Sequence, residues 1–464
     1  MSGPSNNPHT SAIARFVAQL RYDAIPAEVV TRIKLLILDS LGCALYGADL
    51  EWSRILRQTL GKVDTTKGCR VWGTAERLSA PHAALVNGTL IQSFELDDVH
   101  RQGVLHVGAV TLPPLIAVTE LRPGLSGRDF LTAAAAGYEI GPRVGKCMGP
   151  QHIGQGWHSG ATVGVFSAVS GAASALRLSP EQAVHALGIA GTQSSGLMAA
   201  QYGAMVKRMH AGRAAQSGLY GALLAGAGFT GIVDVFESPY GGFCTTFSRS
   251  NDRFNLPELS SELGRRWETL HVSLKFYSCV GSNHTTLDAI RMLQATTPFG
   301  PGDIDKIIVH GSQVTVEHVG WPYVPQGLTS AQLNLPFCVA TLLLENDVFV
   351  DQFTDAVVND ARRIALSKKV SVLHDPDITA RGSNYRHMVR VEVSLKNGAR
   401  IEQTVEAPRG SESSFASEAD IVRKFKTLAT HSIGAAQADA IVNLVLGADK
   451  LARAEQIAEA LAIG

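Results

Sequence analysis

The segment FELDDVHRQGVLH, residues 94 to 106, combines acidic and imidazole side chains directly after an apolar run. Its carboxylates are Glu95, Asp97 and Asp98, and its imidazoles are His100 and His106. Groups of these types can bind a metal ion, transfer protons or simply face solvent. The spacing of the two histidines does not match a helical metal motif, and a glycine interrupts the stretch between them. Metal binding is therefore the weaker interpretation.

The position of these carboxylates favours a cleft over a solvated surface. The pattern predicts a helix from about Pro81 that continues through the segment. On such a helix Glu95 lies four residues after Ile91, and Asp98 lies four residues after Phe94. Carboxylates on an apolar face are costly to bury without partners. The alternative is a helix that ends in a polar loop.

Two later segments could supply partners for these carboxylates. In GQGWHSGATVGVF (154–166), His158 precedes a helix rich in small residues, whose dipole disfavours the cationic ring. The segment MVKRMHAGRAAQSG (205–218) gathers four basic side chains, Lys207, Arg208, His210 and Arg213. Cations packed among Ala and Gly need anions, either from the protein or from a substrate. A helix cap and a solvated basic face are the respective alternatives.

Two segments of the second half also carry candidate groups. In LKFYSCVGSNHTTLDAI (274–290), a small polar loop at 278–284 precedes a predicted helix. Its backbone amides and the helix dipole would bind an anion, unless they serve only as a helix cap. In WPYVPQGLTSAQLNLPF (321–337), Tyr323 lies among prolines. It either closes a pocket or packs within a turn.

The elements that must position these groups are helical in the first half of the chain. Residues 26–47 form an apolar helical pattern with Pro26 at its first position. Residues 129–147 and 160–176 are rich in Ala and Gly, which let helices approach closely. Ser179-Pro180-Glu181-Gln182 is typical of a capped helix start. We therefore expect a compact helical bundle.

The pattern changes after about residue 265. Residues 304–318 contain a β-branched run, and residues 389–395 alternate apolar and polar side chains. Asn397-Gly398 then predicts a two-residue hairpin. Helical patterns return after Ser417, a predicted N-cap. We expect the last helices to pack back onto the first half of the chain.

Composition limits the classes of function. The chain has 464 residues, of which 45% are hydrophobic, and its 41 basic and 41 acidic side chains balance. This charge balance gives no reason to expect nucleic acid or an anionic membrane as partner. Six scattered cysteines without a CxxC pair, together with a polar N-terminus, predict a cytoplasmic protein. No nucleotide-binding or serine-hydrolase motif is present.

Six motifs in this order resemble the MmgE/PrpD family: LILDSLGCALYG, FELDDVHRQGVLHVGAV, GWHSGATVG, VKRMHAGRAA, KFYSCVGSNH and PRGSESSFASEADIVRKF. The family includes 2-methylcitrate dehydratase, cis-aconitate decarboxylase and iminodisuccinate epimerase. The resemblance implies a mainly α fold, with a helical domain (1–265 and 401–464) and a smaller α/β lid domain (266–400). It also implies a homodimer and a site between the domains that needs neither cofactor nor metal.

The resemblance also implies a set of site residues. The decarboxylase-like site of the family corresponds to Glu95, Val99, His106, His158, Lys207, His284 and Tyr323. Where the decarboxylases have Asp and Thr, this chain has Glu95 and Val99. The spacing from Asp98 to His106 is also one residue longer than in the animal decarboxylase. These departures favour the dehydratase branch of the family.

We therefore hypothesise two groups of site residues. Catalysis is expected from His106, His158, Asp98, Lys207 and Tyr323. Substrate binding is expected from Glu95, Lys207, His210, His284 and Ser282. The leading function is dehydration of a 2-methylcitrate-like hydroxy acid through a carbanion beside a carboxylate. The alternatives are cis-aconitate-type decarboxylation or iminodisuccinate-type epimerisation, a metal-dependent hydratase, and a non-catalytic carboxylate-binding protein.

Overall fold

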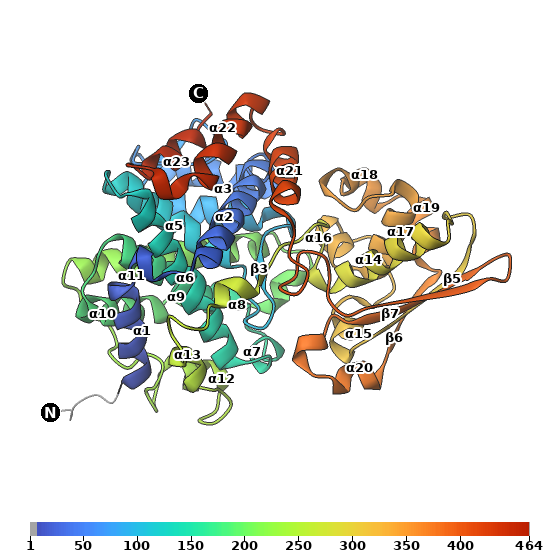
Figure 1. Cartoon of the computed structure of the whole chain (residues 1–464), viewed down its shortest axis with the longest axis horizontal. Helices are drawn as coiled ribbons and strands as arrows, with labels where there is room; N and C mark the ends of the chain where they lie inside the picture. Colours follow the sequence, from blue (N-terminus) through green and yellow to red (C-terminus); the bar gives the residue numbers. More distant parts are fainter. Residues whose placement is uncertain (1–6, 464) are drawn as a thin grey trace.

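The computed structural model describes residues 7–463 and shows two domains of unequal size (Figure 1). Helices make up 58% of the structure and strands 8%. This confirms the prediction of a mainly α fold with a smaller α/β part. Both ends of the described chain lie in the larger, helical domain (Figure 1). Within residues 7–463, no helix combines the length and apolar character that crossing a membrane requires.

The large domain is built around two central helices, α9 (Gly164–Ala175) and α11 (Val206–Gly226). The longer helices around them are α1 (Pro8–Gln19), α2 (Ala27–Gly47), α3 (Glu51–Val63), α4 (Ala80–Ile91), α5 (Val107–Leu121), α6 (Gly127–Met148) and α10 (Pro180–Gly191). Four short helices complete this part: α7 (Gln151–Gly154), α8 (Ser159–Thr162), α12 (Phe243–Ser248) and α13 (Pro257–Ser260). The capping box predicted at Ser179 is present at the start of α10.

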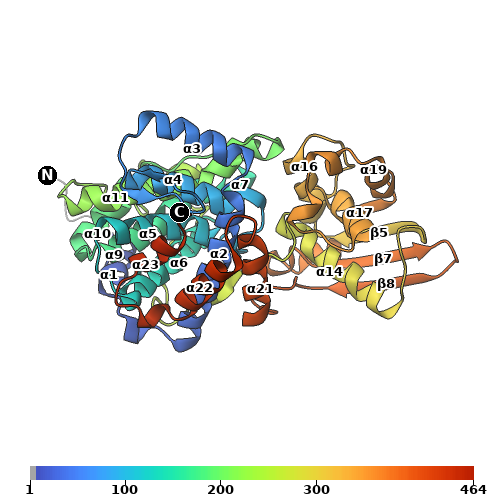
Figure 2. The same ribbon diagram turned by 90° about the horizontal axis from the view of Figure 1, so that it is seen from above.

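The C-terminal helices belong to the same body as the first half of the chain. They are α21 (Glu418–Ala429), α22 (Ala435–Leu446) and α23 (Glu455–Ala460). Helices α21 and α22 pack against α2, and α23 packs against α5 (Figure 2). Ser417 caps α21 by accepting a hydrogen bond from the amide of Asp420, so the predicted N-cap is confirmed.

The small domain contains a four-stranded sheet in the order β6-β5-β7-β8. The strands are β5 (Ile304–Gly311), β6 (Val370–His374), β7 (Val389–Leu395) and β8 (Arg400–Val405). β6 is parallel to β5, and the other neighbours are antiparallel. The predicted alternation is confirmed, because every second residue of β7 is buried. The predicted hairpin joins β7 to β8, but its loop has three residues, 396–398, and not the two that were predicted.

Helices of the small domain cover this sheet and extend toward the large domain. They are α14 (Gly281–Thr296), α15 (Gln313–Val319), α16 (Leu328–Leu333), α17 (Leu335–Glu345), α18 (Asp355–Val358), α19 (Ala361–Ser367) and α20 (Pro376–Ala380). Because β8 runs to Val405, the sheet continues past the boundary at residue 400. The exact limits of the domains stay a prediction.

Two further pairs of short strands lie outside this sheet. β1 (Cys69–Arg70) pairs with β2 (Arg77–Leu78). β3 (Val99–His100) pairs with β4 (Val272–Ser273). The second pair joins the acidic segment to the chain that leaves the large domain.

The expected helix through the acidic segment is not formed. Helix α4 ends at Ile91, and a 3₁₀ turn over Gln92–Phe94 follows it. Glu95 has left-handed backbone angles, φ 57° and ψ 30°, which no α-helix accommodates. The chain therefore turns at Glu95, although the expected burial holds, because Glu95 and Asp98 are 2% and 0% exposed.

Two smaller expectations are also corrected. Pro26 is the N-cap of α2 and precedes its first helical residue. The β-branched run at 304–318 forms a strand only as far as Gly311. Ser312 then caps α15 by accepting from the amide of Thr315, and this local bond starts a helix.

Helices α4 and α11 cross at a point where only glycine fits, as the small-residue packing predicts. A Cβ added at Gly212 would lie 2.0 Å from the carbonyl oxygen of Leu85. We expect Gly212→Ala to lower the free energy of unfolding by about 1–3 kcal/mol through overpacking. Denaturant unfolding measures this loss. Gly61→Ala on α3 is the control, because its Cβ meets nothing within 4 Å and should stabilise the helix by about 0.5–1 kcal/mol.

Candidate active site

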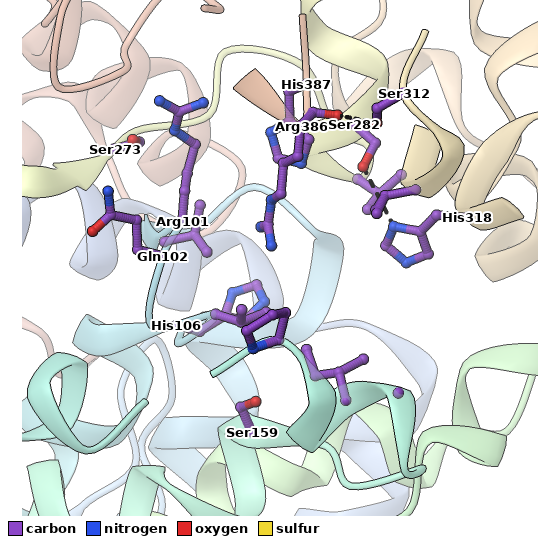
Figure 3. A pocket seen from close by; sticks show the side chains of 18 of the residues that line it. Arg101, Gln102, His106, Ser159, Ser273, Ser282, Ser312, His318, Arg386 and His387 are labelled. Carbon is purple, nitrogen blue, oxygen red and sulfur yellow. Dashed lines mark hydrogen bonds between the residues drawn. The ribbon is translucent and has the colours of Figure 1, made fainter. Parts of the chain in front are cut away.

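A cavity of about 990 Å³ lies between the two domains. The large domain lines it with the segment around residues 95–106, His158 and Lys207. The small domain lines it with the first turn of α14, with α15 and with the chain before β7. Figure 3 shows His106 on one side of the cavity and Arg386, His387 and His318 on the other.

An aspartate and a histidine form a pair at the large-domain side of the cavity. The Nδ1 of His106 lies 2.9 Å from Oδ2 of Asp97. Asp97 is fully buried, whereas the His106 side chain keeps 14% exposure toward the cavity. A carboxylate on Nδ1 fixes the ring orientation and leaves Nε2 for a proton transfer. The partner of His106 is therefore Asp97 and not Asp98, the carboxylate that the sequence analysis placed among the catalytic residues.

Glu95 lies beside three buried cations. Its carboxylate contacts the ammonium of Lys207, the guanidinium of Arg208 at 2.8 Å and the ammonium of Lys275 at 3.5 Å. Burial alone would raise the pKa of Glu95, but the charges of Lys207, Lys275 and Arg208 hold it well below its ordinary value. Glu95 is thus an anion that neutralises these cations. Both Glu95 and Lys207 line the cavity as predicted, and they are paired with each other.

Within the described part of the chain, Arg386 is the cavity cation that has no acidic partner. Among the described residues, no carboxylate oxygen lies within 4 Å of its guanidinium. The other cavity cations are paired; Arg101, for example, lies 3.1 Å from Glu412 through its Nε. Burial and the charge of Arg101 lower the pKa of Arg386 to about 10, so it stays charged at neutral pH. An anionic ligand would supply the missing partner.

Hydroxyl groups hold the backbone that carries Arg386. Ser312 and Thr315 donate hydrogen bonds to the Arg386 carbonyl at 2.6 and 3.0 Å. Thr285 donates to the carbonyl of His387 at 2.6 Å. These three bonds tie the chain before β7 to α14 and α15, and they direct Arg386 into the cavity (Figure 3).

The remaining histidines of the cavity can donate or accept hydrogen bonds. Burial and the charge of Lys207 lower the pKa of His158 well below its ordinary value, so the ring is neutral at pH 7. Nε2 of His284 lies 3.1 Å from the carbonyl of Cys279, which can only accept. The hydroxyl of Ser282 lies 3.3 Å from Nδ1 of His318. His158, His284 and Ser282 all line the cavity, as predicted.

Asp98 and His210 do not line the cavity. Asp98 accepts hydrogen bonds from the amide of Gly108 at 2.9 Å and from the hydroxyl of Tyr138 at 3.0 Å. Burial and the charge of Asp97 raise its pKa to about 8, which places a largely protonated side chain next to the Asp97–His106 pair. His210 packs against His158, with ring centroids 4.7 Å apart. Both residues support the site from outside it.

Tyr323 is a packing residue and does not reach the cavity. Its hydroxyl donates to the carbonyl of Val358 at 2.9 Å, and its ring lies 4.4 Å from that of Phe337. We expect Tyr323→Phe to keep wild-type turnover while losing about 1 kcal/mol of unfolding free energy with the hydrogen bond. Steady-state kinetics and denaturant unfolding measure the two effects. A large loss of kcat with unchanged stability would restore the catalytic role.

Several site residues were missed by the sequence analysis. Lys275 lies in a segment that was singled out, but no periodicity linked it to Glu95. Arg386 and His387 lie three and two residues before β7, and a basic dipeptide just before a strand was the available signal. Within the part of the chain that the structure describes, no group of three or more His, Cys, Asp or Glu side chains is arranged to hold a metal ion.

Comparisons with known proteins define the family. The model of the MmgE/PrpD N-terminal domain matches residues 11–255, and that of the MmgE/PrpD C-terminal domain matches residues 277–448. The chain belongs to the MmgE/PrpD family, as its motifs predict.

Similar curated proteins align along nearly the whole chain. A cis-aconitate decarboxylase-like protein of Aspergillus oryzae is 34% identical, across 97% of this chain and 96% of the relative. A cis-aconitate decarboxylase of Aspergillus terreus is also 34% identical, across 97% and 95%. The cis-aconitate decarboxylase of Mus musculus is 26% identical, across 94% and 90%.

Proposed function

We propose that the protein is a lyase that decarboxylates a small unsaturated tricarboxylate of the cis-aconitate type. The observation that carries this proposal is Arg386, which has no acidic partner among the described residues and lines the same cavity as His106, the partner of Asp97. The names of the similar proteins favour decarboxylation over the 2-methylcitrate dehydration that the sequence analysis placed first. They are named for cis-aconitate decarboxylation, although Glu95 and Val99 depart from the decarboxylase pattern.

The proposed reaction has one bond to break and one proton to place. Loss of carbon dioxide breaks the bond between the saturated carbon and its carboxylate. The electron pair of that bond forms a new double bond between the saturated carbon and its neighbour. The electrons of the original double bond move onto the carbon beside another carboxylate. That carbon then takes one proton. The site must therefore hold the retained carboxylates, stabilise the spreading charge and deliver a proton.

The residues of the cavity divide these tasks. Arg386 would bind a retained carboxylate and stabilise the charge that develops on it, which a preorganised cation does best in a water-poor site. His106, held by Asp97, would deliver the proton from Nε2. The neutral ring of His158 would donate a hydrogen bond to a second carboxylate. The amides at the start of α14 face the same cavity through Gly281 and Ser282 and favour anions there.

A panel of acids tests this proposal. Purified protein is incubated with cis-aconitate, 2-methylcitrate, citrate and iminodisuccinate, and proton NMR follows the products. We expect loss of carbon dioxide from cis-aconitate at the highest kcat/KM. Faster loss of water from 2-methylcitrate would reinstate the dehydratase, and no change in any acid would favour a binding protein.

A further inference from the structure

A buried lysine outside the cavity contacts the backbone of the acidic turn. The ammonium of Lys424, on α21, donates a hydrogen bond to the carbonyl of Leu96 at 2.7 Å. It also lies 2.6 Å from a carboxylate oxygen of Asp39, on α2. The two side chains are 2% and 0% exposed. This pair lies beneath the turn and does not line the cavity.

Leu96 lies between Glu95 and Asp97, and the directions of these two side chains determine the geometry of the site. Glu95 projects to the cations Lys207 and Arg208, and Asp97 projects to His106. The turn between them is not part of a helix, so no intrahelical hydrogen bond fixes its carbonyls. The Leu96 carbonyl is therefore the point at which one contact can set the directions of both side chains.

Packing between two helices explains how Lys424 reaches this carbonyl. A Cβ added at Gly42 of α2 would lie 3.2 Å from Cα of Phe425, a tight contact that shows how closely α2 and α21 approach each other. The close approach brings Lys424 to Asp39, one turn earlier on α2. Burial alone would lower the pKa of Lys424, but the contact with Asp39 and the charges of Asp39, Cys43 and Asp97 together raise it, so the ammonium remains charged.

We propose that Lys424 is a positioning residue, which fixes the turn at residues 95–98 so that Asp97 holds His106 in its reactive orientation. Lys424 touches neither substrate nor the reacting atoms in this proposal. Its effect on turnover rests on the proposed function, because the turn serves that reaction. Lys424 lies on α21, which follows the small domain in the chain. In this proposal α21 therefore helps to support the site.

Kinetics of three variants test the role in turnover. Lys424→Met removes the charge and the hydrogen bond and should lower kcat by about 100-fold, the scale expected for a small misplacement of catalytic groups. KM should change little, because Arg386 still binds the substrate. Lys424→Arg keeps the charge and should recover part of the rate. Lys426→Met is the matched control on the same helix, with a side chain 45% exposed, and should keep wild-type kcat.

The double variant Asp39→Asn/Lys424→Met separates positioning from general stability. Removing both members of a buried ion pair often costs little stability, whereas removing one leaves an unpaired charge. The double variant should therefore regain most of the melting temperature that Lys424→Met loses, but not its kcat. Recovery of kcat together with the melting temperature would overturn the proposal, as would full turnover by Lys424→Met.

Hydrogen–deuterium exchange tests the positioning without any substrate. Backbone amides of residues 95–106 should exchange faster in Lys424→Met and in the double variant than in the wild type or Lys426→Met. Unchanged exchange in this segment would overturn the proposal. If the wild type turns over none of the acids, the proposed function fails, and the exchange measurement still decides the role of Lys424.

Discussion

Replacing Arg386 by Met is expected to lower kcat/KM for the substrate by a factor of roughly 30 to 5,000. Truncating one member of a buried charge pair typically costs about 2–5 kcal/mol. The loss should appear in both KM and kcat, because Arg386 would hold a carboxylate in the bound state and stabilise the charge that spreads onto it. Steady-state kinetics measure the two constants.

The same substitution should not weaken the free protein. Among the described residues Arg386 has no acidic partner, so its removal leaves no carboxylate unpaired. We therefore expect a melting temperature equal to or above that of the wild type. Arg381→Met is the control, since Arg381 lies on the same stretch of chain with 42% exposure and pairs with Glu406. Wild-type kcat/KM in Arg386→Met would remove Arg386 from the site.

Replacing His106 by Ala is expected to lower kcat by about 10²–10⁴-fold, the usual contribution of a general acid or base. Asp97→Asn should lower kcat by a factor on the order of 10², because the amide cannot stabilise a protonated ring. The double variant should be no slower than His106→Ala, since the two side chains act as a unit. Steady-state kinetics at saturating substrate measure these effects.

The chain offers a matched pair for this comparison. His82 and Asp64 form a similar contact, with Nδ1 and Oδ2 2.7 Å apart, at a position that does not line the cavity. His82→Ala and Asp64→Asn should leave kcat unchanged. Additive losses in the double variant at His106 and Asp97, or full turnover by His106→Ala, would contradict the assigned proton transfer.

Sequence patterns predicted those elements whose stabilising contacts lie within a few residues of each other in the chain. The alternation of residues 389–395 matched β7, because one face of that strand is buried. The capping box at Ser179 and the N-cap at Ser417 matched helix starts, because each is a contact within one turn. The prediction of a helix through Glu95 was wrong. Glu95 has left-handed backbone angles, and its side chain contacts Lys207 and Arg208, which are distant in the sequence.

Site residues that lie within a sequence motif could be predicted. Site residues that only tertiary packing brings to the cavity could not. His106, His158 and Lys207 lie in quoted motifs, and all three line the cavity. The choice of Asp98 over Asp97 depended on helical spacing, which the turn at Glu95 removes. Arg386 reaches the cavity only through the pairing of β7 with β5 and the hydroxyls of α14 and α15, which no local pattern reveals.

The most direct test of the account is the reaction of the wild-type protein with cis-aconitate in deuterium oxide. Proton NMR and mass spectrometry would determine the product and the number of deuterium atoms it contains. We expect one carbon dioxide to be released per product molecule. We also expect one deuterium on the carbon beside the carboxylate that accepted the charge. Unchanged cis-aconitate, or deuterium exchange without loss of carbon dioxide, would contradict the account.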